Sequence, residues 1–163
     1  MLNALRCLRM KFKSSRSFIM GHNSHTSFAD FTHAAQQAQQ WVRELAGDLS
    51  WSEPSSCRLL RCVLHSVRDW LSQAEMADLS AQLPVLVRGI YFEGWKPSAP
   101  ACERTKRDFI LSVRNSFGYD DEIDFDVAIN AVFKLLDRHI SHGEIVQVRN
   151  SMKKSLRNLW PVN

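Results

Sequence analysis

Four basic residues recur along one expected helix at spacings of three, four and three residues: Arg58, Arg61, His65 and Arg68. This spacing places all four on one stripe of an α-helix. A basic stripe of this kind can bind a phosphate ligand, RNA or an acidic partner helix. The same spacing also describes the solvent-facing side of any amphipathic helix. The stripe is therefore a candidate binding surface rather than a catalytic one.

Five acidic residues gather just before another expected helix: Asp120, Asp121, Glu122, Asp124 and Asp126. Closely spaced carboxylates are the ligands that Ca²⁺ prefers. An EF-hand loop begun at Asp120 would need Gly and Glu where the chain has Phe125 and Ala131. Acids at this place also cap a helix N-terminus and favour its positive end. We expect capping and no metal site.

Other residues of catalytic or metal-binding type are scattered. His139 and His142 are separated by Ser141, which is expected to begin a new helix, so the two rings need not share a face. No CxxC pair occurs among the four cysteines, Cys7, Cys57, Cys62 and Cys102. Their placement suits a reducing cytoplasm and predicts apolar fillers or surface thiols. Motifs for nucleotide, nucleophile or zinc chemistry are absent from the sequence, which lowers the expectation of an enzyme, and no cofactor is predicted.

A short aromatic cluster follows the first half of the chain. Tyr91 has an aromatic counterpart later in the sequence and is expected in the core. Phe92 and Trp95 have no such counterpart. They are either packed anchors of a linker, the interpretation we favour, or an exposed contact patch.

Helical spacing of apolar residues runs through the chain from Phe28 onward, and no segment alternates like a strand. The first helix is expected to stop at Gly47 and the second to begin at Ser52. Ser72 and Glu75 form a capping box before a third helix, and Pro84 breaks the chain before a helix over 85–92. In the second half, a helix ending at Gly118, a long helix over 125–140 and a last helix after Ser141 are expected, with Lys153 in place of the breaking proline. The sequence predicts an all-α fold.

The two halves repeat one apolar pattern. Residues 60–91 and 129–160 coincide at an offset of 69, pairing Val63 with Val132 and Tyr91 with Trp160. Two tandem units, 28–92 and 103–160, joined by a linker at 93–102, are therefore expected to pack into one bundle-like domain over 28–161. The stripe on the first unit is not kept in the second, where the equivalent residues are Val127, Asn130, Lys134 and Asp137.

The net charge of +4 arises in an N-terminal tail. Residues 1–27 carry five basic residues and no acid, whereas the rest of the chain has a net charge of −1. Charge therefore gives no argument for nucleic acid as partner of the domain. The tail has no continuous apolar region, and we expect a disordered basic extension. The longest apolar runs fall short of a membrane span, so a soluble protein is expected, and the placement of the cysteines favours the cytoplasm.

Several of these segments resemble the bacterial domain-of-unknown-function 2267 family. The resemblance rests on the runs 63–71, 81–84 and 87–95, and in the second half on 108–118 and 156–160. It extends over about residues 28–161 and departs where Met152 and Lys153 stand in place of Leu and Pro. The family implies a duplicated helical domain in prokaryotic cytoplasm and no established activity.

A non-enzymatic module that binds another protein, or itself, is the function we expect from these features. Nucleic-acid or phosphate binding through the basic stripe is the alternative, which we do not favour. The two differ in salt dependence, because phosphate contacts weaken steeply as salt rises.

Overall fold

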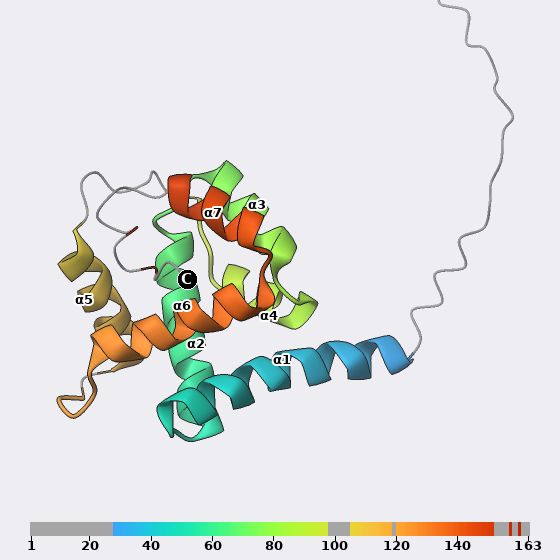
Figure 1. The fold of residues 1–163 in the computed structure, drawn as a ribbon, viewed down its shortest axis with the longest axis horizontal. Coiled ribbons are helices and arrows are strands. Elements are labelled where there is room, and N and C mark those ends of the chain that lie inside the picture. Colours follow the sequence, from blue (N-terminus) through green and yellow to red (C-terminus); the bar gives the residue numbers. More distant parts are fainter. Residues whose placement is uncertain (1–27, 98–104, 119, 152–156, 158–159, 161–163) are drawn as a thin grey trace, which may run out of the picture.

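In the computed structural model, every described element of the chain is an α-helix (Figure 1). The structure describes residues 28–97, 105–118 and 120–151, together with Arg157 and Trp160. Within these residues lie seven helices: α1 (Phe28–Leu49), α2 (Glu53–Arg68), α3 (Gln73–Gln82), α4 (Val85–Phe92), α5 (Lys106–Phe117), α6 (Phe125–His139) and α7 (His142–Ser151). They include no strand, and the predicted all-α class is confirmed. The basic tail and residues 98–102 of the expected linker lie outside the described part.

The end of α1 differs from the sequence prediction. Gly47 does not stop the helix, which continues to Leu49. The Ser50 N–H donates to the Gly47 carbonyl at 3.3 Å, and the Trp51 N–H donates to the Ala46 carbonyl at 3.0 Å. Ser50 has a φ of 55°. These are the two bonds and the left-handed residue of a Schellman motif, so Ser50 fills the role that the sequence assigned to glycine.

The starts of the next helices follow the predicted caps. The Ser52 side chain accepts a hydrogen bond from the Ser55 N–H at the start of α2. Ser72 and Glu75 form the expected capping box of α3. Between α3 and α4 the backbone of Leu83 is extended and Pro84 occupies the N-cap of α4. The predicted break at Pro84 is confirmed, because a residue before proline avoids helical geometry.

Local capping residues also set the ends of the helices in the second half of the chain. Asp124 caps α6 by accepting hydrogen bonds from the Asp126 and Val127 N–H groups. Gly118 ends α5 with a φ of 108°, which glycine adopts without strain. α7 begins after Ser141, whose carbonyl accepts from the Ile145 N–H. The region around Lys153, where the sequence lacks the breaking proline, lies outside the described residues.

One hydrophobic core joins all seven helices. α2 and α6 pack against each other in its centre; α1 contacts α2 and α6, and α5 contacts the same two helices. α3 and α7 lie side by side across the core from α1 (Figure 1). Val63 of α2 and Val132 of α6 are both completely buried. The result is a compact helical domain, and none of its described helices is long and apolar enough to cross a membrane.

Candidate functional site

The basic residues of α2 are engaged within the molecule. The Arg58 guanidinium lies 4.2 Å above the ring centre of Phe117 at the end of α5. Arg61 pairs with Glu93 at 3.1 Å. The Nε2 atom of His65 lies 2.7 Å from the Ile90 carbonyl oxygen. The end of α4, the residue that follows it and the end of α5 therefore contact this side of α2.

Arg68 belongs to the interior and does not lie on an exposed stripe. Its side chain is 6% exposed. Nη1 donates to the carbonyls of Tyr91 and Glu93, both at 2.9 Å, and Nε pairs with Asp69 at 2.8 Å. A guanidinium with three such partners ties the end of α4 to α2. The expectation that all four basic residues share one surface is corrected by this burial.

The aromatic residues after α4 pack inward. Phe92 and Trp95 are half-buried against the core. The ring centre of Phe92 lies 5.0 Å from that of Tyr91 and 6.2 Å from that of Trp95, and both ring pairs have an edge-to-face geometry. Tyr91 is completely buried, as expected. The favoured interpretation of Phe92 and Trp95, packed linker anchors, agrees with these contacts.

The acidic turn supports helices. Asp124 caps α6, as expected. Asp121 pairs with Arg114 at 2.7 Å, and Asp126 pairs with Lys106 at 2.7 Å. Nowhere in the described residues do three His, Cys, Asp or Glu side chains gather closely enough to hold a metal ion.

The described cysteines are free thiols, Cys57 half-buried and Cys62 buried. Burial raises the pKa of the Cys62 thiol, although Arg58 and Arg61 oppose the shift. Such a thiol is a poor nucleophile at neutral pH. Cys7 and Cys102 lie outside the described residues.

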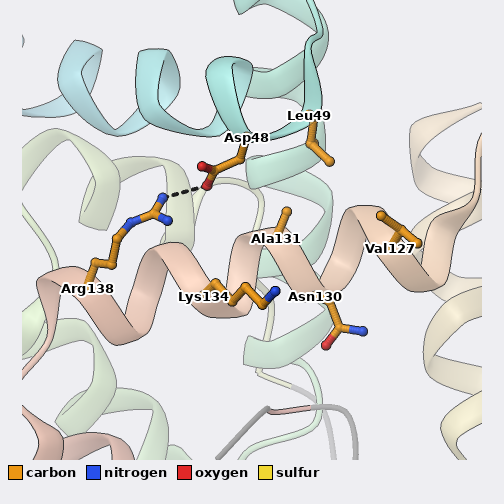
Figure 2. Close-up of a pocket in the computed structure, with 7 residues that line it drawn as sticks. All are labelled: Asp48, Leu49, Val127, Asn130, Ala131, Lys134 and Arg138. Atoms are coloured by element: carbon orange, nitrogen blue, oxygen red, sulfur yellow. Dashed lines mark hydrogen bonds and ion pairs between the residues drawn. The ribbon is translucent and has the colours of Figure 1, made fainter. Parts of the chain in front are cut away.

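A groove of about 710 Å³ lies between the end of α1 and the outer side of α6 (Figure 2). It is lined by Asp48, Leu49, Val127, Asn130, Ala131, Lys134 and Arg138. Its apolar part comes from Leu49, Val127 and Ala131. Val127 is 58% exposed, so the groove presents an apolar side chain to solvent. Among the described residues, Lys134 has no ion-pair partner.

One wall of the groove is held by ion pairs between α1 and α6. Arg138 donates to Asp48 at 2.6 Å and lies 3.5 Å from Glu44 (Figure 2 shows the first pair). His139 approaches Glu44 at 2.8 Å, and its ring stacks on Trp41 with centres 4.8 Å apart. Burial raises the pKa of Glu44, but the contacts with His139, Gln40 and Arg138 outweigh burial and leave the pKa below its usual value of 4.5.

This wall predicts a pH dependence of stability. Because the pKa of Glu44 is lower in the folded state than in the unfolded state, its contribution to the free energy of unfolding is complete at pH values above the unfolded-state pKa. This contribution is lost as the pH falls through the folded-state pKa. We expect Glu44→Gln to lower the free energy of unfolding at pH 7 by less than about 1 kcal/mol, because the pair is partly exposed. Urea unfolding at pH 7 and at pH 3 measures this effect. The difference in free energy of unfolding between variant and wild type should be smaller at pH 3. An unchanged difference would contradict the role given to the carboxylate.

The sequence did not single out the groove. Val127, Asn130 and Lys134 were recognised only as the positions that replace the basic stripe in the second half. No motif marks them, because the groove forms between two segments about eighty residues apart. The signal available was an apolar residue, Val127, at a position where its counterpart is Arg58.

Comparison with known proteins gives a family and no activity. No curated protein matches the sequence. A family model described as "Uncharacterized conserved protein (DUF2267)" matches residues 38–159, which include every described residue of α2, α3, α4, α5, α6 and α7. The chain therefore belongs to the DUF2267 family.

Proposed function

We propose that this domain is a non-enzymatic protein-interaction module and that the groove between α1 and α6 is its docking site. The observation that carries the proposal is the combination of an exposed Val127 with an unpaired Lys134 in one hollow of the described surface. Fixed ion pairs in one wall keep the groove in shape before a partner arrives. The free thiols Cys57 and Cys62 fit the cytoplasmic location expected from the sequence.

The lining of the groove defines the chemistry of its partner. Leu49, Val127 and Ala131 favour a large apolar side chain, whose removal from water drives binding. Lys134 favours a carboxylate close to that side chain, and this charge contact sets orientation. The partner we propose is a protein segment that presents an aromatic or large aliphatic residue beside an acid.

We also propose that the domain is a tandem duplication, as the apolar pattern predicts. Helices α3 and α7 support this, since their first residues, Gln73 and His142, differ by 69 residues. Equivalent positions have equal burial: Val63 and Val132 are both 0% exposed, and Tyr91 and Trp160 are 0% and 1% exposed. Such agreement follows if both halves use the same packing.

Polar contacts recur at the same offset. Arg88 donates to the Ala81 carbonyl, and Arg157, 69 residues later, donates to the carbonyl of Asn150, also 69 residues later. A contact also joins two equivalent positions, Asp78 and Gln147, at 3.5 Å. Equivalent residues meet in this way at the axis that relates two halves. These contacts support a twofold relation between the units.

A duplication accounts for the groove. In the first unit Arg58 covers the Phe117 ring, and the two residues line a smaller hollow of about 360 Å³ between α2 and the end of α5. The residue equivalent to Arg58 is Val127, at the offset of 69, and the residue equivalent to Phe117 is Ala46, at an offset of 71 that aligns Gly47 with Gly118 upstream of this region. Both are smaller than their counterparts. The second contact therefore lacks the volume of an aromatic ring and a guanidinium. The groove lies where this pair has been lost.

The alternative, nucleic-acid or phosphate binding through α2, has weaker support. Arg61 and Arg68 are paired with acids, and Arg68 is buried. Arg58 is exposed and has no ion-pair partner among the described residues, although its guanidinium lies over the Phe117 ring. One available cation offers little of the salt-dependent affinity that phosphate binding needs.

Capture from a bacterial lysate with the full chain as bait tests the proposal. We expect a protein that is retained by the wild type and reduced at least about tenfold by Lys134→Glu, because the partner's acid then meets a like charge. Lys96→Glu makes the same charge change at an exposed site away from the groove, and its capture should equal the wild type. Equal capture by both variants would contradict the groove as docking site. Recovery of nucleic acid alone, lost at high salt, would favour the alternative.

A further inference from the structure

The hollow between α2 and the end of α5 is lined by charges of both signs. Its volume of about 360 Å³ lies within the range of about 300–1,000 Å³ that pockets for small molecules have. Arg58 lines it from α2, and Asp120 and Glu122 line it from the turn that follows α5. These three side chains form no ion pair with one another or with any other described residue. A positive wall and a negative wall therefore border one hollow without neutralising each other.

The other charged groups near this hollow already have partners. They are Glu53 with Arg43, Asp121 with Arg114, Asp126 with Lys106, and Asp124 with the N–H groups that it caps. The charge that the hollow offers to a ligand therefore comes from one guanidinium and two carboxylates.

The first turn of α2 adds a hydroxyl donor to the positive wall. Ser52 donates to the Ser55 Oγ atom at 3.0 Å, so Ser55 is the acceptor in this contact. The hydroxyl proton of Ser55 has no acceptor among the described residues. Ser55 lies three residues before Arg58, which places both side chains on one side of the helix near the positive end of its dipole. This wall suits a carboxylate.

The rest of the lining includes apolar side chains. Trp51 and Ile123 are half-buried and pack on the core. The ring centre of Trp51 lies 5.9 Å from that of Phe117. Because Arg58 already covers the Phe117 ring, Trp51 and Ile123 are the apolar surfaces left for a ligand. Contact with them would remove an apolar side chain from water.

We propose that this hollow binds a small zwitterion, an α-amino acid with an apolar side chain. The carboxylate of the ligand pairs with Arg58 and accepts a hydrogen bond from Ser55. Its ammonium group pairs with Asp120 and Glu122, and its side chain lies against Trp51. A purely basic ligand would meet Arg58 and a purely acidic one would meet two carboxylates, so charge complementarity favours a ligand with both signs. The site shares no lining residue with the groove between α1 and α6 and does not depend on its proposed role.

Titration of the full chain with L-phenylalanine, followed by two-dimensional NMR, tests the proposal. The indole N–H signal of Trp51, assigned with Trp51→Phe, should shift saturably. We expect a dissociation constant of about 1 mM, because the charged groups are exposed. Two analogues isolate the charges: phenethylamine lacks the carboxylate, and 3-phenylpropionate lacks the ammonium group. Each should bind at least about fivefold more weakly, because one wall then has no partner.

Variants assign each charge to its wall. Arg58→Gln should raise the dissociation constant of phenylalanine at least about fivefold without weakening the binding of phenethylamine. The double variant Asp120→Asn/Glu122→Gln should have the same effect on phenylalanine without weakening 3-phenylpropionate. An asparagine at the first position can still accept the hydrogen bond that Asp120 accepts from the Glu122 N–H, so the turn should be kept. Lys96→Gln and Asp78→Asn are matched controls at exposed sites elsewhere and should bind like the wild type.

Absence of a saturable shift at Trp51 would overturn the proposal. Equal binding of phenylalanine and either analogue would overturn it too, because one of the walls would then have no part in binding. Tighter binding of 3-phenylpropionate than of phenylalanine would indicate a simple anion site on α2 instead. Circular dichroism of each variant distinguishes unfolding from loss of the site. Capture by the groove is measured separately with Lys134→Glu, so the two proposals can fail independently.

Discussion

Val63→Asp and Val132→Asp should each prevent the domain from folding at neutral pH. Both valines are completely buried in the contact between the central helices α2 and α6. Burial of a carboxyl group without a partner costs at least several kcal/mol, or the group stays protonated at a similar cost. A domain of this size has a total stability of only about 5–15 kcal/mol. Circular dichroism should show loss of the cooperative thermal transition in both variants.

Val85→Asp is the control for this experiment, because it makes the same substitution at a position that is 66% exposed. Its melting temperature should stay within a few degrees of the wild type, since exposed substitutions change stability by less than about 0.5 kcal/mol. A wild-type melt for Val63→Asp or Val132→Asp would contradict the packing described for that helix. If only one of them melted like the wild type, the proposed equivalence of the two positions would fail.

Arg68→Leu should have the second largest effect. The variant leaves the carbonyls of Tyr91 and Glu93 without their guanidinium donor at the end of α4. Buried acceptors that lose a charged donor destabilise a protein by about 2–4 kcal/mol. Urea unfolding should show a fall of this size in the free energy of unfolding, with a largely unchanged slope.

Arg58→Leu is the control that distinguishes the loss of the Arg68 hydrogen bonds from the effect of removing any positive charge from α2. It removes a guanidinium from the same helix, but one that is exposed and lies over an aromatic ring. Loss of such a contact costs about 0.5–1 kcal/mol. Equal effects of the two variants would contradict the role of Arg68 as the tie between α2 and α4. In that case the basic stripe would regain its place as a candidate ligand surface.

Helix starts could be predicted from the sequence because their signals are local. Ser52, Ser72 and Asp124 each satisfy N–H groups two or three residues away, so the residue types reveal the caps. The end of α1 could not be predicted in the same way. Ser50 adopts a left-handed conformation that glycine adopts more easily, and Gly47 stays inside the helix. Local propensity favoured the wrong residue, and the hydrogen bonds of the Schellman motif fix the real end.

The position of Arg68 could not be deduced from spacing. A spacing of three and four residues tells which side of a helix a residue occupies, but not what covers that side. Here the covering segment is the end of α4, whose carbonyls accept the guanidinium hydrogen bonds. The groove was hidden for a related reason. It is lined by residues near Leu49 and residues near Val127, and no single window of sequence contains both.

The unequal sides of α2 and α6 have a consequence for how such a domain evolves. In a homodimer, one gene encodes both subunits, so each surface change appears twice. Under the proposed duplication, the two halves are encoded separately and can diverge. One half can keep the contact of Arg58 with Phe117 as a permanent support. The other can open at Val127 and acquire new contacts without loosening its counterpart.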